Sequence, residues 1–220
     1  MSKVKNLGLD NSLLNEFLGE LRNVNIQQDS LRFRKNLERI GSIFAYEISK
    51  TMQYKTQDIT TPLGVSTMNI LQEQPILATI LRAGLPVHQG LLNFFDRSEN
   101  AFIAAYRKHH QDSSFEIQLH YMSGPRLQDK ILILSDPMIA SGKSMLLAFD
   151  ELLHNGKPKH THFVSIIAST QGIEYMEKNL RSVNCTIWVG AIDEELTAQS
   201  YIVPGLGDAG DLAFGEKLDE

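Results

Sequence analysis

Five short apolar runs restrict the fold of this chain more than any other feature of its sequence. They span residues 76–81, 101–106, 130–135, 162–168 and 185–189. Runs that are apolar on both faces are typical of parallel strands covered by helices on both sides. Helices are expected between them at 144–153 and 173–180. This alternation predicts an α/β fold with a doubly wound, mostly parallel central sheet flanked by helices.

A long amphipathic helix is expected before the sheet. Its apolar residues recur at spacings of four, three, four and four, which places them on one helical face. They are Phe33, Leu37, Ile40, Phe44 and Ile48. Asp29 or Ser30 is expected to cap the start of this helix. Residues 1–25 carry no comparable pattern and are expected to pack loosely.

Residues 56–70 are expected to form a protruding β-hairpin arm. Two partly alternating segments, 56–61 and 65–70, flank the turn sequence Pro62-Leu63-Gly64. A lone two-stranded hairpin is at best marginally stable in water. The arm is therefore expected to pack on another subunit of a homodimer or a higher homo-oligomer.

The composition limits the function classes that the chain can serve. Its 220 residues fit a single domain, 1–220, and its 42% apolar content supplies a core. A net charge of −5 argues against nucleic acid as a partner. The apolar runs are too short to span a membrane, no signal peptide is expected, and the single cysteine, Cys185, suits a reducing compartment. A cytoplasmic location without membrane contact is expected.

The topology is expected to bring several loops to one place. In doubly wound sheets, ligands bind beyond the carboxyl ends of the strands. The loops that begin at Arg82, Tyr106, Asp136 and Asp193 are therefore expected to converge on one site.

The loop after the third apolar run carries the strongest chemical signal. It reads Asp136, Pro137, Met138, Ile139, Ala140, Ser141, Gly142, Lys143 and Ser144. Backbone N–H groups at the following helix start, together with the hydroxyls of Ser141 and Ser144, suit a phosphate dianion. A carboxylate at Asp136 binds phosphate poorly but accepts hydrogen bonds from sugar hydroxyls.

Two other interpretations of the loop 136–144 compete with this one. An ordinary strand–turn–helix would use Asp136 as a turn residue and Ser144 as a helix cap. A Walker A loop would end in Gly142-Lys143-Ser144, but its first glycine position holds Pro137. Proline lacks an amide donor, which argues against a loop built from amides.

Four segments together resemble one family, the uracil phosphoribosyltransferases of the type I phosphoribosyltransferase superfamily. They are the loop 136–144, the stretch 80–85, the pair Tyr106-Arg107 and the segment 201–215. In that order they resemble the loop for phosphoribosyl pyrophosphate (PRPP), the pyrophosphate loop, the second arginine site and the uracil-binding signature. The start Asp136-Pro137-Met138 is the variant found in the uracil enzymes. The resemblance runs from about Asp29 to the C-terminus.

The resemblance implies transfer of the 5-phosphoribosyl group from PRPP to uracil, giving UMP and pyrophosphate in pyrimidine salvage. The implied catalytic residues are Arg82, Asp136 and Asp208. The implied PRPP ligands are Arg82, Arg107, Asp208 and the loop from Asp136 to Ser144. The implied uracil ligands, in a small C-terminal hood over the base, are Ile202, Gly207, Asp208 and Ala209. Mg²⁺ is the implied cofactor, held mainly by PRPP rather than by a protein metal site.

The sequence departs from the family pattern at two places. Lys143 stands where a glycine is usual, and a left-handed backbone there would cost about 1 kcal/mol or more. Residues 108–111, in the implied flap, lack the acidic run of many members. Two alternatives stay open: a non-catalytic or RNA-binding pyrimidine-nucleotide sensor of the same fold, and a degenerate paralogue in which Lys143 fills the phosphate site.

Two histidines raise a separate question. His160 and His162 could place two imidazoles on one strand face, but the sequence suggests no third metal ligand. They are expected to be exposed at the start of a strand.

Overall fold

The computed structural model describes residues 3–109 and 115–217, with the backbone alone for 105–109 and 115–120. Within these residues, eight strands form a sheet in the order β1-β10-β9-β7-β4-β5-β6, with β8 paired to β9. In that order the strands are β1 Lys3–Asn6, β10 Cys185–Asp193, β9 His160–Ser169, β7 Ile131–Ser135, β4 Ile76–Leu81, β5 Asn100–His109 and β6 Phe115–Ser123, with β8 Met138–Ile139. Neighbouring strands run parallel except β5 and β6, which are antiparallel.

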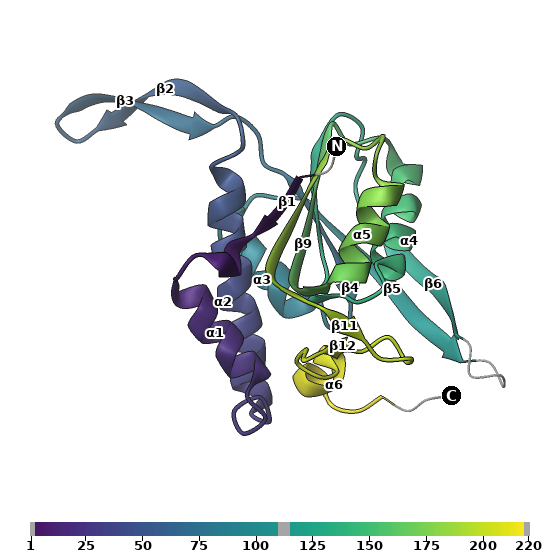
Figure 1. The fold of residues 1–220 in the computed structure, drawn as a ribbon. Coiled ribbons are helices and arrows are strands. Elements are labelled where there is room, and N and C mark those ends of the chain that lie inside the picture. The colour runs from purple at the N-terminus through teal and green to yellow at the C-terminus, as the bar shows by residue number, and fades with distance from the viewer. Residues whose placement is uncertain (1–2, 110–114, 218–220) are drawn as a thin grey trace.

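Helices cover both faces of this sheet, as the apolar runs predict (Figure 1). On one face lie α1 Leu13–Arg22, α2 Ser30–Ser49 and α3 Leu85–Leu92, and on the other α4 Lys143–Leu152 and α5 Thr170–Asn179. Strand β7 shows why: Ile131 and Ile133 belong to the core under α1–α3, whereas Leu132 and Leu134 belong to the core under α4 and α5. The predicted doubly wound architecture is confirmed.

The predicted long helix is α2, and its cap is Asp29. The Asp29 carboxylate accepts hydrogen bonds from the backbone N–H groups of Leu31 and Arg32 at 3.0 and 3.1 Å. The expectation of a loosely packed segment 1–25 is wrong. Strand β1 pairs with β10, and α1 buries three leucines against α2 and the sheet, Leu14, Leu18 and Leu21.

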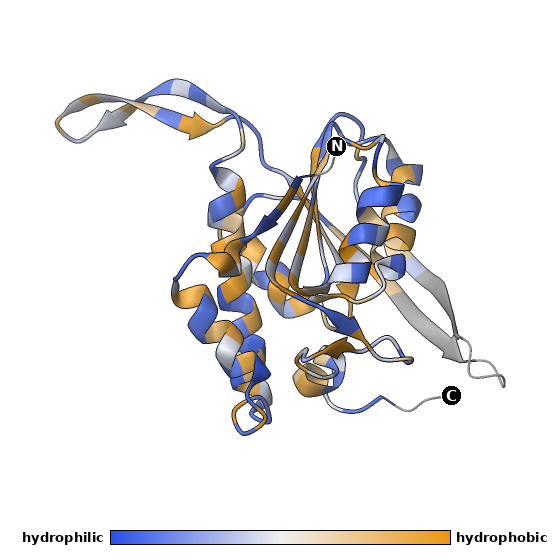
Figure 2. Cartoon of the chain, viewed as in Figure 1, coloured by the Kyte–Doolittle hydropathy of each residue, from blue (hydrophilic) through white to orange (hydrophobic). Residues whose placement is uncertain are grey.

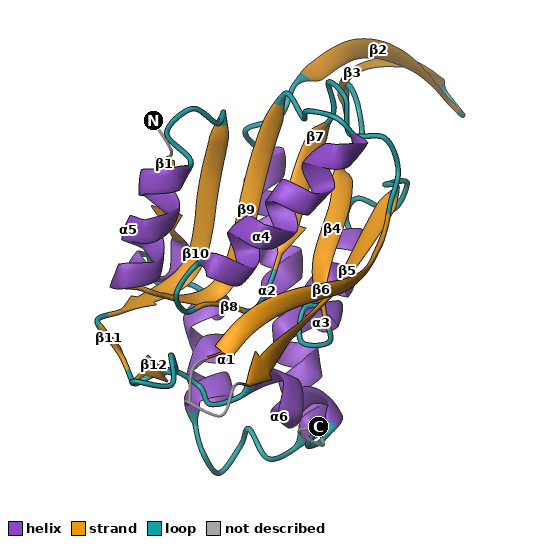
Figure 3. Cartoon of the chain, turned by 90° about the vertical axis from the view of Figure 1, so that its right-hand side faces the viewer, coloured by secondary structure: helices purple, strands orange, loops and turns teal. Residues whose placement is uncertain are grey.

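The predicted arm consists of β2 Tyr54–Thr61 and β3 Gly64–Leu71, paired antiparallel. It projects from one end of the sheet, and the C-terminal segment lies at the opposite end (Figures 1 and 3). Several of its apolar side chains are exposed, and Leu63 at the turn is fully so. Figure 2 shows orange, apolar stretches along this arm, which stands clear of the rest of the chain.

The C-terminal segment forms a small unit beyond the sheet. It contains the hairpin of β11 Glu195–Leu196 and β12 Ile202–Val203, followed by the helix α6 Ala209–Phe214. Short 3₁₀ turns at Leu7–Leu9 and Leu153–Asn155 complete the described elements. Among the described residues, no helix is both long and apolar enough to cross a membrane.

His162 is buried, contrary to the expectation of an exposed histidine, because a tryptophan from the next strand provides its hydrogen bond. Trp188 Nε1 donates to His162 Nδ1 at 3.0 Å, and the side chain of His162 is only 4% exposed. Burial, then the nearby His160 and Lys5, lower the pKa of His162 to about 3. Lys5 lies over the Trp188 ring, so two further basic groups, from β9 and β1, face this imidazole.

Acid is therefore expected to destabilise the fold through His162. The folded-state pKa lies below the ordinary value of 6.5, so this stabilising contribution is complete above pH 6.5 and is lost progressively as the pH falls toward 3. The free energy of unfolding is expected to fall by about 2 kcal/mol between pH 7.5 and pH 5 from this group alone. Urea titrations over that range measure it. His162→Gln should flatten the profile, whereas the same change at exposed His154 should leave it unaltered, and equal profiles for both variants would contradict the prediction.

Candidate active site

Three of the four predicted loops meet at one end of the sheet. Arg82 follows β4, Asp136 follows β7 and Asp193 ends β10, all at the carboxyl ends of parallel strands. The prediction of a loop that begins at Tyr106 is wrong, because β5 continues to His109 and pairs with β6. The backbone of Arg107 lies within β5, and its side chain lies outside the described part of the chain, as do residues 110 and 111 of the implied flap.

The first half of the loop 136–144 is fixed to the sheet. The Asp136 N–H donates to the Val164 carbonyl at 3.1 Å, and the Pro137 carbonyl accepts from the N–H of Ile166 at 3.0 Å. Strand β8 then pairs with β9. The second half, from Ala140 on, is therefore the part that is able to face a ligand.

The second half of this loop opens directly into a helix. Gly142 has the left-handed backbone, with φ of 75°, and Lys143 is the exposed first residue of α4. The expected strain at Lys143 does not arise, because the glycine before it carries the unusual conformation. A Cβ on Gly142 would also approach Gly172 and Tyr175 on α5. The start of α4 thus offers backbone N–H groups to an anion, next to the hydroxyl of Ser141.

Arg82 links the sheet to the C-terminal segment. Its Nη2 donates to Asp211 Oδ1 at 3.2 Å and to the Gly215 carbonyl at 3.1 Å. Both partners come from α6 or the residue that ends it. Two segments that the sequence separates by about 130 positions therefore adjoin, and their motifs predict that both belong to the same site.

Asp208 caps α6 in addition to its expected ligand role. Its Oδ1 accepts from the N–H groups of Gly210 and Asp211 at 2.9 and 3.1 Å, and its Oδ2 lies 3.4 Å from Lys217 Nζ. Burial alone would raise the pKa of Asp208, but these amides and the Lys217 ammonium hold it below its ordinary value. Asp208 is therefore a carboxylate at neutral pH.

The predicted uracil-binding residues surround the turn between β12 and α6. Ile202 and Ala209 are buried, whereas Gly207 is exposed. An open depression of about 320 Å³ is lined by Gly207 and Asp208 together with Gln27, Gln28 and Ser30. Its volume is at the lower end of the range for small-molecule pockets.

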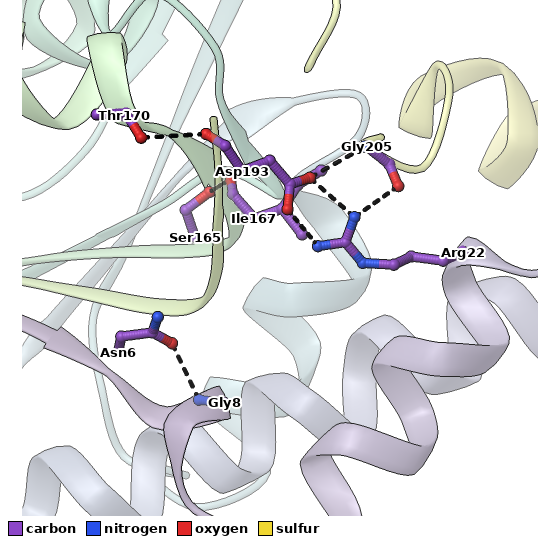
Figure 4. Close-up of polar contacts among 8 residues, drawn as sticks. All are labelled: Asn6, Gly8, Arg22, Ser165, Ile167, Thr170, Asp193 and Gly205. Carbon is purple, nitrogen blue, oxygen red and sulfur yellow. Dashed lines mark hydrogen bonds and ion pairs between the residues drawn. The ribbon is translucent and has the colours of Figure 1, made fainter. Parts of the chain in front are cut away.

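Two arginines that the sequence did not single out as site residues hold this C-terminal segment. Arg22, at the end of α1, forms two hydrogen bonds of 2.8 Å with the Asp193 carboxylate, and a third, of 2.9 Å, with the Gly205 carbonyl (Figure 4). Arg34 on α2 donates to the Ala213 carbonyl at 2.6 Å, at the end of α6. Sequence motifs and periodicity could not predict these contacts, because the partners lie 171 and 179 positions apart.

Carboxylates of the predicted site are suitable ligands for Mg²⁺. Among the described residues, no group of three or more His, Cys, Asp or Glu side chains could hold a metal ion. Two carboxylates belong to the predicted site: Asp136, which follows β7, and Asp208, which caps α6. Mg²⁺ typically uses one or two carboxylates together with substrate phosphates and water, so these residues fit it.

The comparisons with known proteins agree with this geometry. A family model described as uracil phosphoribosyltransferase matches residues 8–216. A uracil phosphoribosyltransferase from Porphyromonas gingivalis is 54% identical over 98% of this chain and 100% of its own length. Another, from Pyrococcus furiosus, is 36% identical over 95% of this chain and 89% of its own length.

Solved structures show where this fold is found. The AQ2163 protein from Aquifex aeolicus superposes with a TM-score of 0.85 and 29% identity, over 96% of this chain and 98% of its own. The orotate phosphoribosyltransferase from Mycobacterium tuberculosis, solved with PRPP, has a TM-score of 0.51 at 9% identity over 84% of this chain and 91% of its own, which shows a shared fold alone. With a family model covering nearly its whole length and a close relative matched end to end, the chain belongs to the uracil phosphoribosyltransferase family.

Proposed function

We propose that this chain transfers the 5-phosphoribosyl group of PRPP to uracil, forming UMP and pyrophosphate. The observation that carries the proposal is the contact of Arg82 with Asp211 and Gly215. It joins the loop that would bind pyrophosphate to the segment that would bind the base. A transferase needs both substrates within reach of one reacting carbon, and this contact supports that arrangement.

The loop from Asp136 to Ser144 is assigned to the ribose 5-phosphate. Its amides at the start of α4 and the hydroxyls of Ser141 and Ser144 would bind the 5-phosphate. The Asp136 carboxylate would accept hydrogen bonds from the ribose hydroxyls. Exposed Lys143 would add positive charge at the rim of this phosphate site.

The reaction needs no protein nucleophile. The bond from C1 of the ribose to pyrophosphate breaks, the sugar becomes oxocarbenium-like, and uracil N1 bonds to C1 and releases its proton. Arg82, Arg107 and the carboxylate of Asp208 would position the reactants and stabilise the charges that develop. A guanidinium has five N–H donors, so the Nη2 contacts of Arg82 leave its other donors for pyrophosphate. Mg²⁺, when bound, would neutralise part of the negative charge of pyrophosphate.

Uracil is assigned to the segment around Ile202, Gly207 and Ala209. The base presents one N3–H donor and two carbonyl acceptors along the edge that would be read. A backbone carbonyl can accept from N3–H, and backbone N–H groups can donate to the carbonyls. Ile202 lies in β12, Gly207 in the turn that follows and Ala209 at the start of α6, so one short segment carries all three backbone positions.

The direct test mixes the purified chain with PRPP, Mg²⁺ and uracil, and measures both products. UMP and pyrophosphate are expected in equal amounts. Product with a different base and none with uracil would reassign the substrate. An absence of turnover, together with salt-sensitive RNA binding, would replace the enzyme by a nucleotide sensor. We also place the enzyme in the cytoplasm, where a free cysteine stays reduced.

We further propose that the arm joins subunits of a homodimer or a higher homo-oligomer. The register places Ile59, Met68 and Ile70 on one face of the two-stranded arm. An apolar face on a lone hairpin is unstable unless something covers it. The arm is therefore assigned to a neighbouring subunit.

Met68→Lys is accordingly expected to shift the assembly toward monomers, by about tenfold or more in dissociation constant. Light scattering behind gel filtration measures the masses over a dilution series. Thr67→Lys is the matched control, because Thr67 lies on the other face, opposite Asp58. A wild-type chain that is monomeric at every concentration would contradict the assignment.

A further inference from the structure

A nearly buried ion pair lies behind the segment assigned to uracil. Asp193, at the end of β10, is 7% exposed, and the side chain of Arg22 is 23% exposed. Their two parallel hydrogen bonds, both of 2.8 Å, form the bidentate geometry that fixes orientation as well as distance. Burial raises the pKa of Asp193, and the Arg22 and Gly205 hydrogen bonds more than offset this and hold it below its ordinary value.

Both peptide groups of Gly205 attach to this pair. Its N–H donates to Asp193 Oδ2 at 2.9 Å, and its carbonyl accepts from Arg22 Nη1 at 2.9 Å (Figure 4). Gly205 has φ of 61°, and a Cβ there would collide with the Ile202 carbonyl. The chain thus turns tightly at Gly205, and the Arg22–Asp193 ion pair fixes this turn through hydrogen bonds to both backbone groups of Gly205.

Gly205 lies within the segment assigned to uracil, so the ion pair that holds it can affect base recognition. It lies three residues after Ile202 and two before Gly207, so it separates backbone groups assigned to the base. Backbone groups recognise a base only if the chain path is fixed, since no side-chain rotamer can adjust for a displaced peptide. Apolar contacts of Leu206 and Ile202 with the core hold the segment without setting its orientation.

We propose that Arg22 is a positioning residue for base recognition, acting through Asp193 and Gly205 to hold the turn that reads uracil. The proposal rests on the proposed function and adds a residue to it. Arg22 does not touch substrate in this role. The first half of the loop 136–144 is held by β9 and, within the described part of the chain, makes no hydrogen bond to Arg22 or Gly205, so the ion pair is expected to act on the base more than on PRPP.

The test replaces Arg22 by lysine, which keeps the charge beside Asp193 but loses the bidentate fork. The KM for uracil is expected to rise about tenfold or more, and the preference for uracil over cytosine to fall. The KM for PRPP is expected to stay within about twofold. Arg32→Lys is the matched control, because Arg32 makes the same kind of fork with Glu20, also on α1, and it should leave all three quantities unchanged.

Binding measurements keep the proposal separate from catalysis. In calorimetry, Arg22→Lys should weaken UMP binding about tenfold or more and leave PRPP binding unchanged. An unchanged uracil KM with unchanged UMP affinity would overturn the proposal, and so would equal losses for both substrates. If the wild-type chain makes no UMP, the proposed function fails on its own, and the binding comparison still decides the role of Arg22.

Discussion

Cytosine is expected to be a poorer substrate than uracil by about 10⁴-fold or more in kcat/KM. Its N3 is an acceptor where uracil has a donor, and its amino group is a donor where uracil has a carbonyl. Backbone groups around Ile202, Gly207 and Ala209 cannot change from donor to acceptor, so cytosine would leave them unpaired in a desolvated site. Initial rates with each base at fixed PRPP measure the ratio.

A fluorinated uracil provides the control for this experiment. 5-Fluorouracil keeps the N3–H and both carbonyls, so its kcat/KM is expected to lie within about tenfold of that of uracil. A ratio of cytosine to uracil close to one would show that the base is not read by these backbone groups. A large loss with 5-fluorouracil and not with cytosine would instead point to recognition by shape at C5.

Arg82→Ala is expected to lower kcat by about 10²- to 10³-fold. The guanidinium would stabilise negative charge that grows on pyrophosphate as the C1–O bond breaks, so its removal should act on the transition state more than on substrate binding. Single-turnover rates at saturating PRPP and uracil measure this step directly.

The contact of Arg82 with α6 needs a control of its own. Asp211→Asn removes the ion pair but leaves the arginine and the helix in place. Because the two side chains are 44% and 31% exposed, this change is expected to cost less than about tenfold. If Arg82→Ala and Asp211→Asn lost activity equally, the role of Arg82 would be to hold α6 rather than to stabilise the leaving group.

The central strands were the most predictable part of the fold. β4 begins and ends at the residues that the apolar run predicts, and the helix α2 matches its apolar spacing and its cap at Asp29. The spacing of apolar residues within β4 and within α2 is enough to predict which side chains are buried. The strand β7, the loop 136–144 and the helix α4 were predictable for the same reason, because they are contiguous, and the binding of PRPP by this loop stays a prediction.

The elements that the sequence did not predict depend on distant partners. β1 has two lysines in four residues and becomes a strand because β10 offers its edge. His162 is buried because Trp188 from the next strand provides a hydrogen bond. The contacts of Arg22 and Arg34 with the C-terminal segment join helices to residues more than 170 positions away. The periodicity of neighbouring residues cannot predict contacts between residues so far apart in the sequence.

Calorimetric titration of UMP, with and without saturating PRPP, tests the central claim most directly. UMP contains both the ribose 5-phosphate and the base, so it would occupy the loop from Asp136 to Ser144 and the turn around Gly207 together. One UMP per chain is expected, and PRPP should abolish its binding because both ligands place a 5-phosphate on the same amides. UMP that binds equally well with PRPP present, or that does not bind at all, would contradict the account.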